Sequence, residues 1–230
     1  MTSGFLLIDK PAGITSHDVV DRLRRVTGER RIGHAGTLDP FATGLLIVGV
    51  GREATKRLGE IMGQDKEYEA TLAFCGTSDT QDLTGCLTPV PGAVMPTEEQ
   101  IRLALPRFTG RIRQVPPMYS AKKIAGRKLY ELARAGQEVV RQPVAITVHH
   151  WAVLDYRPPY LRFAVRCSSG TYIRTLANDL GEFLACGAYL TMLRRTAIGS
   201  WQVADAAELQ SVTPDNWRGK IFDLPPPDRH

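Results

Sequence analysis

Residues 31–44 read RIGHAGTLDPFATG and lie between a predicted helix and a predicted buried strand. Three glycines in this stretch permit a positive φ or a close approach of the backbone to a ligand. His34, Thr37 and Asp39 add three polar side chains within six residues. Polar loops on a rigid scaffold commonly carry function, so we predict a functional loop here. Because Asp-Pro also starts turns, a purely structural turn is the alternative for Asp39.

The elements on either side of this loop can be predicted from local patterns. Apolar residues at helical spacing predict a helix over residues 15–28, with Asp18 at the position of a capping-box acid. Residues 44–51 form an apolar run that predicts a buried strand. Residues 67–74 alternate between apolar and polar side chains, which is typical of a half-buried strand.

Farther along the chain, helices and strands are mixed without regular βαβ alternation. This order favours an α+β fold with a mixed, largely antiparallel sheet flanked by helices. Residues 77–96 are rich in turn formers and are predicted as a long loop, and residues 107–127 are predicted to be irregular. No internal repeat or long linker divides the sequence, so we expect one domain over residues 1–230.

Composition restricts the class of protein only loosely. The chain has 230 residues, 43% of them hydrophobic, a net charge of +5 and a pI of about 9.1. A mildly basic balance permits a polyanionic partner without demanding one. The four cysteines lack the C-x-x-C spacing of a zinc site, which indicates reduced thiols. The longest apolar run, residues 45–48, is too short to span a bilayer, and no signal peptide is visible. We therefore expect a cytoplasmic protein.

A second candidate segment covers residues 166–176, RCSSGTYIRTL, where a strand ends and a helix begins. Arg174 falls in the first turn of that helix, where a cation is unfavourable against the helix dipole. A carboxylate partner is the natural compensation, and a solvated surface arginine is the alternative.

The third candidate segment covers residues 10–18, KPAGITSHD, a turn that leads into a helix N-terminus. Helix N-termini bind phosphate readily, and Lys10 would add positive charge. His17 and Asp18 suggest a pair of metal ligands, but no second ligand cluster at a useful spacing supports that interpretation. We expect no metal site.

Together these segments resemble the bacterial TruB-type tRNA pseudouridine synthases over nearly the whole chain. The matching motifs are KPAGITSH at 10–17, GHAGTLDPFATG at 33–44, KEY at 66–68, QVPPMYSAKK at 114–123, SGTYIR at 169–174 and LTMLRR at 190–195. The motif around Asp39 is the most specific of them. The resemblance implies the pseudouridine synthase fold with a central catalytic cleft.

The resemblance also implies an activity, the isomerisation of uridine 55 in the T loop of tRNA to pseudouridine, with Asp39 as the catalytic carboxylate. The N1–C1′ bond breaks and a C5–C1′ bond forms, so the reaction needs no cofactor. Whether Asp39 attacks C1′ or acts through a glycal stays open. Arg174 would favour the ionised form of Asp39, because an opposite charge lowers a carboxyl pKa and a guanidinium can bond both oxygens.

The remaining site residues are assigned by the same resemblance. The target base must be flipped out of the RNA at a cost of a few kcal/mol, and stacking on an aromatic ring returns about 1–3 kcal/mol. His34 would lie against the disrupted RNA, Tyr68 would stack on the uracil and Leu193 would close the apolar side of the pocket. Further substrate-binding residues are Lys10, Thr37 and Tyr172. Phosphate contacts are expected from Arg111, Arg113, Lys122, Lys123, Arg127 and Lys128, with a solvated basic face as the alternative.

Many members of this family carry a C-terminal PUA-type RNA-binding domain, and this chain ends near the point where one would begin. We therefore expect the catalytic domain alone, a monomer that binds the T stem-loop of tRNA without a protein partner or a membrane. One rival is a non-catalytic RNA-binding protein on the same scaffold, but Asp39, Tyr68 and Arg174 are all present. Another is a metal-dependent hydrolase that would use His17, Asp18, His34 and Asp39.

Overall fold

The computed structural model describes residues 3–120, 123–124, 127–134, 136–137 and 139–224. The chain divides into two compact units, the first formed by residues 1–68 and 193–230 and the second by residues 69–192. The chain passes between them in β4 (Lys66–Phe74) and β12 (Ala188–Ile198). The expectation of a single domain over residues 1–230 stays a prediction.

The first unit contains a mixed sheet. Its strands follow the order β14 (Ala207–Glu208), β1 (Gly4–Lys10), β3 (Thr43–Val50) and β12, with β2 (Ile32–His34) paired to β3 and β13 (Trp201–Gln202) paired to β12. β1 and β3 are antiparallel, whereas β12 runs parallel to β3. The short 3₁₀ turns of this unit are η2 (Val203–Asp205), η3 (Leu209–Ser211) and η4 (Trp217–Lys220).

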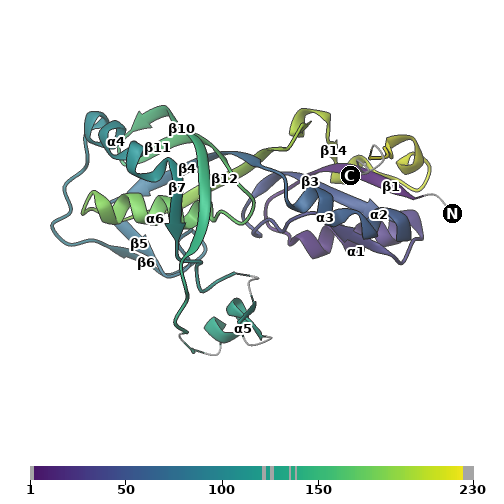
Figure 1. The fold of residues 1–230 in the computed structure, drawn as a ribbon, viewed down its shortest axis with the longest axis horizontal. Coiled ribbons are helices and arrows are strands. Elements are labelled where there is room, and N and C mark those ends of the chain that lie inside the picture. Colours follow the sequence, from purple (N-terminus) through teal and green to yellow (C-terminus); the bar gives the residue numbers. More distant parts are fainter. Residues whose placement is uncertain (1–2, 121–122, 125–126, 135, 138, 225–230) are drawn as a thin grey trace. The chain divides into compact units, whose positions relative to one another are not determined.

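Both faces of this sheet are covered, which is why β3 is an apolar run rather than an alternating strand. On one face, Leu46 and Val48 pack with Leu23 of α1 (Ser16–Thr27). On the other face, Leu45 and Ile47 pack with residues of α2 (Arg52–Lys56) and α3 (Leu58–Met62). Figure 1 shows these three helices beside β1 and β3.

Helix α1 begins and ends at the residues that the sequence predicts. Thr15 and Asp18 form a capping box, since the Thr15 N–H donates to Asp18 Oδ2 at 2.7 Å and the Asp18 N–H donates to Thr15 Oγ1 at 3.0 Å. Gly28 ends the helix with a φ of +70°, a conformation that costs a residue with a side chain more than it costs glycine. The helix predicted over residues 15–28 is confirmed.

The second unit has the strand order β12, β4, β11 (Tyr160–Cys167), β10 (Val144–Arg157) and β7 (Gly110–Gln114). β10 is antiparallel to both β11 and β7. The helices are α4 (Glu98–Ala104), η1 (Leu105–Phe108), α5 (Leu129–Arg134) and α6 (Ile173–Phe183). The ring of Phe108 lies 6.0 Å from Trp151 of β10 and 6.0 Å from Phe183 of α6, so η1 and α6 share a core with the sheet.

Two predictions of irregular structure are wrong. Residues 77–96, predicted as a loop, contain most of the pair β5 (Gly76–Ser78) and β6 (Leu87–Pro89). Residues 107–127, predicted as irregular, contain β7, which pairs with β10 from Val144↔Gln114 to Val148↔Gly110, and also β8 (Lys123–Ile124). β7 forms because β10 supplies hydrogen bonds to it, which no local pattern reveals.

The predicted fold class is confirmed, because the structure is α+β with a mixed, mostly antiparallel sheet. Among the described helices, none has the length and apolar character needed to cross a lipid bilayer.

Candidate active site

Residues 35–44, named here the Asp39 loop, lead from β2 into β3 in the first unit and include the first two residues of β3, Thr43 and Gly44. Main-chain hydrogen bonds hold the loop at several points along its length. The Ala35 N–H donates to Ile47 O at 2.9 Å, and the Gly13 N–H donates to Pro40 O at 2.8 Å. The Ala42 N–H donates to Asp39 O at 3.1 Å and closes a turn directly after the aspartate. Asp39 is therefore carried on a fixed backbone.

Ser16 adds a side-chain clamp next to the aspartate. It is buried at the start of α1, and its Oγ donates to Leu38 O at 3.2 Å and accepts from the Leu38 N–H at 2.9 Å. One hydroxyl thus satisfies both main-chain groups of the residue before Asp39. The sequence contains Ser16 in the KPAGITSH motif, but that motif alone does not reveal this role.

Lys10 lies at the end of β1 with no exposed surface. Its Nζ donates to Ile14 O at 2.7 Å, to Pro11 O at 2.8 Å and to Pro40 O at 3.3 Å. Burial lowers the pKa of Lys10 to about 8, while the nearby charge of Asp39 acts to raise it and that of Arg195 to lower it. Its predicted contact with RNA stays a prediction. In the structure its ammonium ties the turn before α1 to the Asp39 loop.

His34 and Thr37 lie before Asp39 on the same segment. Thr37 is exposed, and His34 ends β2 with its Nδ1 buried and without a hydrogen-bond partner among the described residues. Burial, followed by the charges of Arg195 and His17, lowers the pKa of His34. This shift favours the neutral imidazole.

Tyr68 and Leu193 are buried residues of the first unit, with 9% and 5% of their surface exposed. Leu193 directly precedes Arg194, whose backbone is paired with Thr43 at the end of the Asp39 loop. Two residues before Tyr68, the buried Lys66 donates to Met62 O and Gln64 O at 2.6 Å each and so fixes the start of β4.

Arg174, in the second unit, is not the solvated surface residue of the alternative interpretation, because only 4% of its side chain is exposed. Its Nη1 donates to Thr80 O at 2.7 Å and its Nη2 to Tyr119 O at 2.8 Å. Its Nε lies 3.6 Å from Oδ2 of the buried Asp82. Asp82, in the same unit, is thus a carboxylate partner of the kind expected for a cation at a helix N-terminus. A pairing of Arg174 with Asp39 stays a prediction.

Sequence reasoning missed Asp82, which lies in the segment predicted as a loop. Oδ1 of Asp82 accepts from the Thr84 N–H at 2.9 Å and from Thr80 Oγ1 at 2.8 Å. These bonds orient the carboxylate so that Oδ2 is directed to Arg174. The available sequence signal is an aspartate with threonines on both sides, in the run TSDTQDLTG at 77–85.

Sequence reasoning also missed the role of Gln114. This buried side chain donates from Nε2 to Tyr172 O at 3.0 Å and accepts at Oε1 from the Tyr172 N–H at 2.8 Å. Tyr172 is the N-cap residue of α6 and makes no side-chain capping bond, and the amide of Gln114 holds both main-chain groups of this residue. The clamp fixes the helix start two residues before Arg174.

The predicted phosphate-binding residues are only partly described. Arg111 and Arg113 are exposed on β7, so they are accessible to a polyanion. Lys123, Arg127 and Lys128 lie on β8 and β9 (Arg127–Lys128), and their side chains are outside the described structure, as is all of Lys122. Their phosphate contacts stay a prediction.

The rival metal site finds no support in the described part of the chain, which holds no group of three or more potential ligands. Asp18 is engaged in the capping box with Thr15, and Nε2 of His17 lies 3.7 Å from Asp21.

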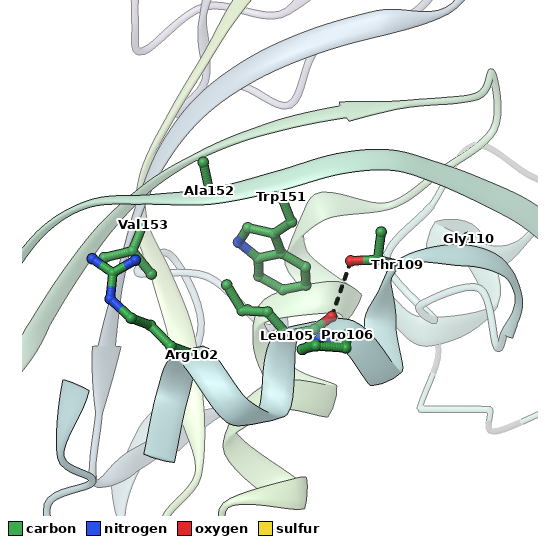
Figure 2. Close-up of a pocket in the computed structure, with 8 residues that line it drawn as sticks. All are labelled: Arg102, Leu105, Pro106, Thr109, Gly110, Trp151, Ala152 and Val153. Atoms are coloured by element: carbon green, nitrogen blue, oxygen red, sulfur yellow. Dashed lines mark hydrogen bonds between the residues drawn. The ribbon is translucent and has the colours of Figure 1, made fainter. Parts of the chain in front are cut away.

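A pocket of about 630 Å³ lies in the second unit between α4–η1 and β10. Figure 2 shows Trp151 pointing from β10 toward Leu105 and Pro106, with Arg102 at the side and Thr109 bonded to Leu105 O at 3.0 Å. Its lining includes none of the predicted site residues.

The fold and the sequence can now be compared with known proteins. A chain in the crystal structure of a Cbf5–Nop10–Gar1 complex has a TM-score of 0.71 at 29% identity, covering 93% of this chain and 54% of that one. A chain in the structure of an H/ACA RNP bound to a substrate RNA containing 2′-deoxyuridine has a TM-score of 0.68 at 26% identity, covering 93% and 53%.

The model of the TruB family pseudouridylate synthase N-terminal domain matches residues 24–173, and that of the tRNA pseudouridylate synthase B C-terminal domain matches residues 174–221. These matches define the class of the protein as a pseudouridylate synthase, which is an isomerase.

Two relatives, both named tRNA pseudouridine synthase B, extend the match. That of Protochlamydia amoebophila is 48% identical over 213 residues, covering 91% of this chain and 80% of the relative. That of Opitutus terrae is 48% identical over 212 residues, covering 91% and 86%. The chain belongs to the TruB family of pseudouridylate synthases, and the family inferred from its motifs is confirmed.

Proposed function

We propose that the chain converts uridine 55 in the T loop of tRNA to pseudouridine, with Asp39 as the catalytic carboxylate. The relatives named tRNA pseudouridine synthase B support tRNA as the substrate. The observation that carries the assignment of Asp39 is the anchoring of its loop at Ala35, Leu38 and Pro40 by main-chain and side-chain bonds. A catalytic group needs such support, because small displacements of a reacting atom lower the rate strongly.

The chemistry needs one ionised carboxylate and no cofactor. The glycosidic N1–C1′ bond breaks, the uracil turns, C5 bonds to C1′, and the proton of C5 is lost while N1 ends protonated. Asp39 either attacks C1′ or removes the proton of C2′ to give a glycal, and both routes start from the anion. The positive charge of the buried Lys10 beside the loop favours a negative charge at that place.

Tyr68, Leu193 and His34 are proposed to handle the flipped base. Stacking on Tyr68 is worth about 1–3 kcal/mol, which is comparable to the few kcal/mol needed to extract a base. A neutral His34 can lie against unstacked RNA without the desolvation cost of a charged imidazole. Thr37, exposed beside it, is available for a hydrogen bond to the RNA.

Arg174 and Tyr172 are proposed to contact the substrate from the second unit. Two main-chain carbonyls and Asp82 determine the direction of the guanidinium of Arg174. The Gln114 clamp fixes the backbone of Tyr172 in the same region of α6. The exposed Arg111 and Arg113 are proposed to add phosphate contacts.

The enzyme is proposed to act as a monomer in the cytoplasm. A Cbf5 chain with a similar fold forms a complex with Nop10 and Gar1, whereas the TruB relatives are named as a single enzyme. Light scattering of the purified chain during turnover tests this proposal, and activity confined to an oligomeric fraction would contradict it.

The test of function uses a T-arm hairpin with tritium at C5 of uridine. We expect tritium release with an equal yield of pseudouridine, unchanged by EDTA as long as the hairpin stays folded. Asp39→Asn is expected to abolish release but to bind the hairpin nearly as the parent does, because the substitution keeps the shape and removes the charge. Turnover of this variant within about tenfold of the parent contradicts the assignment of Asp39.

The same assay separates the rivals. A non-catalytic RNA-binding protein binds the hairpin without releasing tritium. A metal-dependent hydrolase loses turnover in EDTA and regains it with zinc or magnesium, and yields cleaved RNA or free base rather than pseudouridine.

A further inference from the structure

A second buried cation, Arg195, contacts the Asp39 loop. It lies on β12, where the parallel pairing with β3 places it opposite Gly44, the last residue of the loop. Only 1% of Arg195 is exposed. Its Nε donates to Leu45 O at 2.8 Å and its Nη2 donates to Gly36 O at 3.0 Å. One guanidinium therefore links a carbonyl before Asp39 to a carbonyl after it.

Glycines lie near both ends of the loop, where it meets Arg195. Gly36 and Gly44 have φ values of +96° and +103°. A residue with a side chain is strained in this conformation, whereas glycine is not. A Cβ on Gly44 would lie 2.2 Å from Arg195 O, and one on Gly36 would lie 3.6 Å from Arg195 Nη1. In the register of the sheet, Gly44 also faces Lys10 on β1. The loop thus ends between the two buried cations.

Stability alone does not account for a guanidinium at this position. Burying a full charge is costly unless it is paired, and an apolar side chain of similar volume is often neutral or stabilising by comparison. Within the described chain, the hydrogen bonds of the Arg195 side chain go to carbonyl oxygens rather than to carboxylates. The planar guanidinium of Arg195 bonds both carbonyls at once, and so it fixes the distance between Gly36 O and Leu45 O.

We propose that Arg195 is a positioning residue for the reaction, which fixes the two ends of the Asp39 loop and so holds the carboxylate at one place relative to the sugar. This inference rests on the proposed role of Asp39. Lys10 acts on the same loop through Pro40 O, between the two carbonyls that Arg195 holds. Together the two side chains bond three carbonyls within the loop or next to it.

Arg195→Lys tests the proposal, because a lysine keeps the charge but its single nitrogen cannot reproduce the spacing of the guanidinium fork. We expect the single-turnover rate of tritium release at saturating enzyme to fall about tenfold or more. Hairpin affinity, measured in the Asp39→Asn background, is expected to stay within about threefold, since Arg195 is buried. A selective loss of rate distinguishes positioning from general damage to the fold.

Arg195→Met removes both the charge and the hydrogen-bond donors, whereas Arg195→Lys keeps the charge. We expect the single-turnover rate of Arg195→Met to fall at least as much as that of Arg195→Lys. The matched control is Arg57→Lys, because Arg57 also bonds a main-chain carbonyl of the first unit, Leu224 O at 3.1 Å, but belongs to the α2–α3 region. Its rate should equal that of the parent.

The outcomes separate this inference from the proposed function. An inactive parent contradicts the proposed function itself. An active parent with Arg195→Lys and Arg195→Met near parental rate overturns only the role of Arg195. Loss of folding in Arg195→Lys, or a parallel loss of rate and hairpin affinity, would assign Arg195 to stability and also overturn the proposal.

Discussion

The guanidinium of Arg174 and the carboxylate of Asp82 form a buried ion pair, with Nε 3.6 Å from Oδ2 and only 4% and 5% of the two side chains exposed. The pair lies entirely within the second unit. Because two main-chain carbonyls hold the other guanidinium nitrogens, Asp82 supplies the negative charge that lets Arg174 stay buried. Removal of either partner takes away the opposite charge that this ion pair supplies to the other.

Asp82→Asn is therefore expected to lower stability by about 3 kcal/mol, because it removes the carboxylate from a buried ion pair. The rate of pseudouridine formation should fall by about tenfold or more, since Arg174 loses its orientation. Urea unfolding and single-turnover assays measure the two effects. Asp79→Asn, an exposed change in the same segment, is the control and should leave both values unchanged. Parental stability of Asp82→Asn would show that the ion pair contributes nothing.

Arg174→Lys is expected to lower the rate about tenfold or more while the fold is retained. A lysine keeps the charge but cannot bond Thr80 O and Tyr119 O together with Asp82. The far-UV spectrum and the single-turnover rate check the two statements. Arg162→Lys is the control, because Arg162 pairs with Glu69 at a half-exposed position. A parental rate would mean that the fork of Arg174 is not needed.

Lys10 gives a pH prediction with a defined sign. Its pKa is about 8 in the folded protein and 10.5 when unperturbed, because burial disfavours the charged form. Between these values the unfolded chain binds the additional proton, so the contribution of Lys10 to stability rises with pH across this window. Relative to Lys10→Met, the parent should gain stability from pH 8 to pH 10.5.

Urea unfolding of both proteins across that window measures the difference. Equal pH dependence of the parent and the variant would contradict a lowered pKa of Lys10. The rate should move the other way, and fall above pH 8, because the neutral amine no longer favours a negative charge beside it.

The last prediction concerns the RNA. If this chain alone recognises its substrate, a T-arm hairpin should bind to the Asp39→Asn variant within about 1.4 kcal/mol, or tenfold, of whole tRNA. Recognition of this type reads the shape of a loop and its splayed bases, and these are complete in the hairpin. Titrations at two salt concentrations should show a similar, steep loss of affinity for both RNAs. Whole tRNA that binds about a hundredfold more tightly would indicate a second RNA surface.

Local patterns correctly predicted those features near the candidate site whose interacting residues are close together in the sequence. The capping box of Thr15 and Asp18 involves residues three apart, and the alternation of β4 involves neighbours, so both are visible in the sequence. The partners of Arg174 and Arg195 lie far away along the chain and were missed. The same limit applies to β7, which became a strand only by pairing with β10.

The sequence by itself determined the limits of α1, the buried run of β3 and the position of Asp39 in a glycine-rich loop, because each depends on residues within a few positions of one another. Only the tertiary structure decided that Asp82 neutralises Arg174, that Gln114 clamps Tyr172, and that Lys10 and Arg195 hold the Asp39 loop. Buried charges and amides need partners, and which partners they find depends on how distant segments meet in the fold.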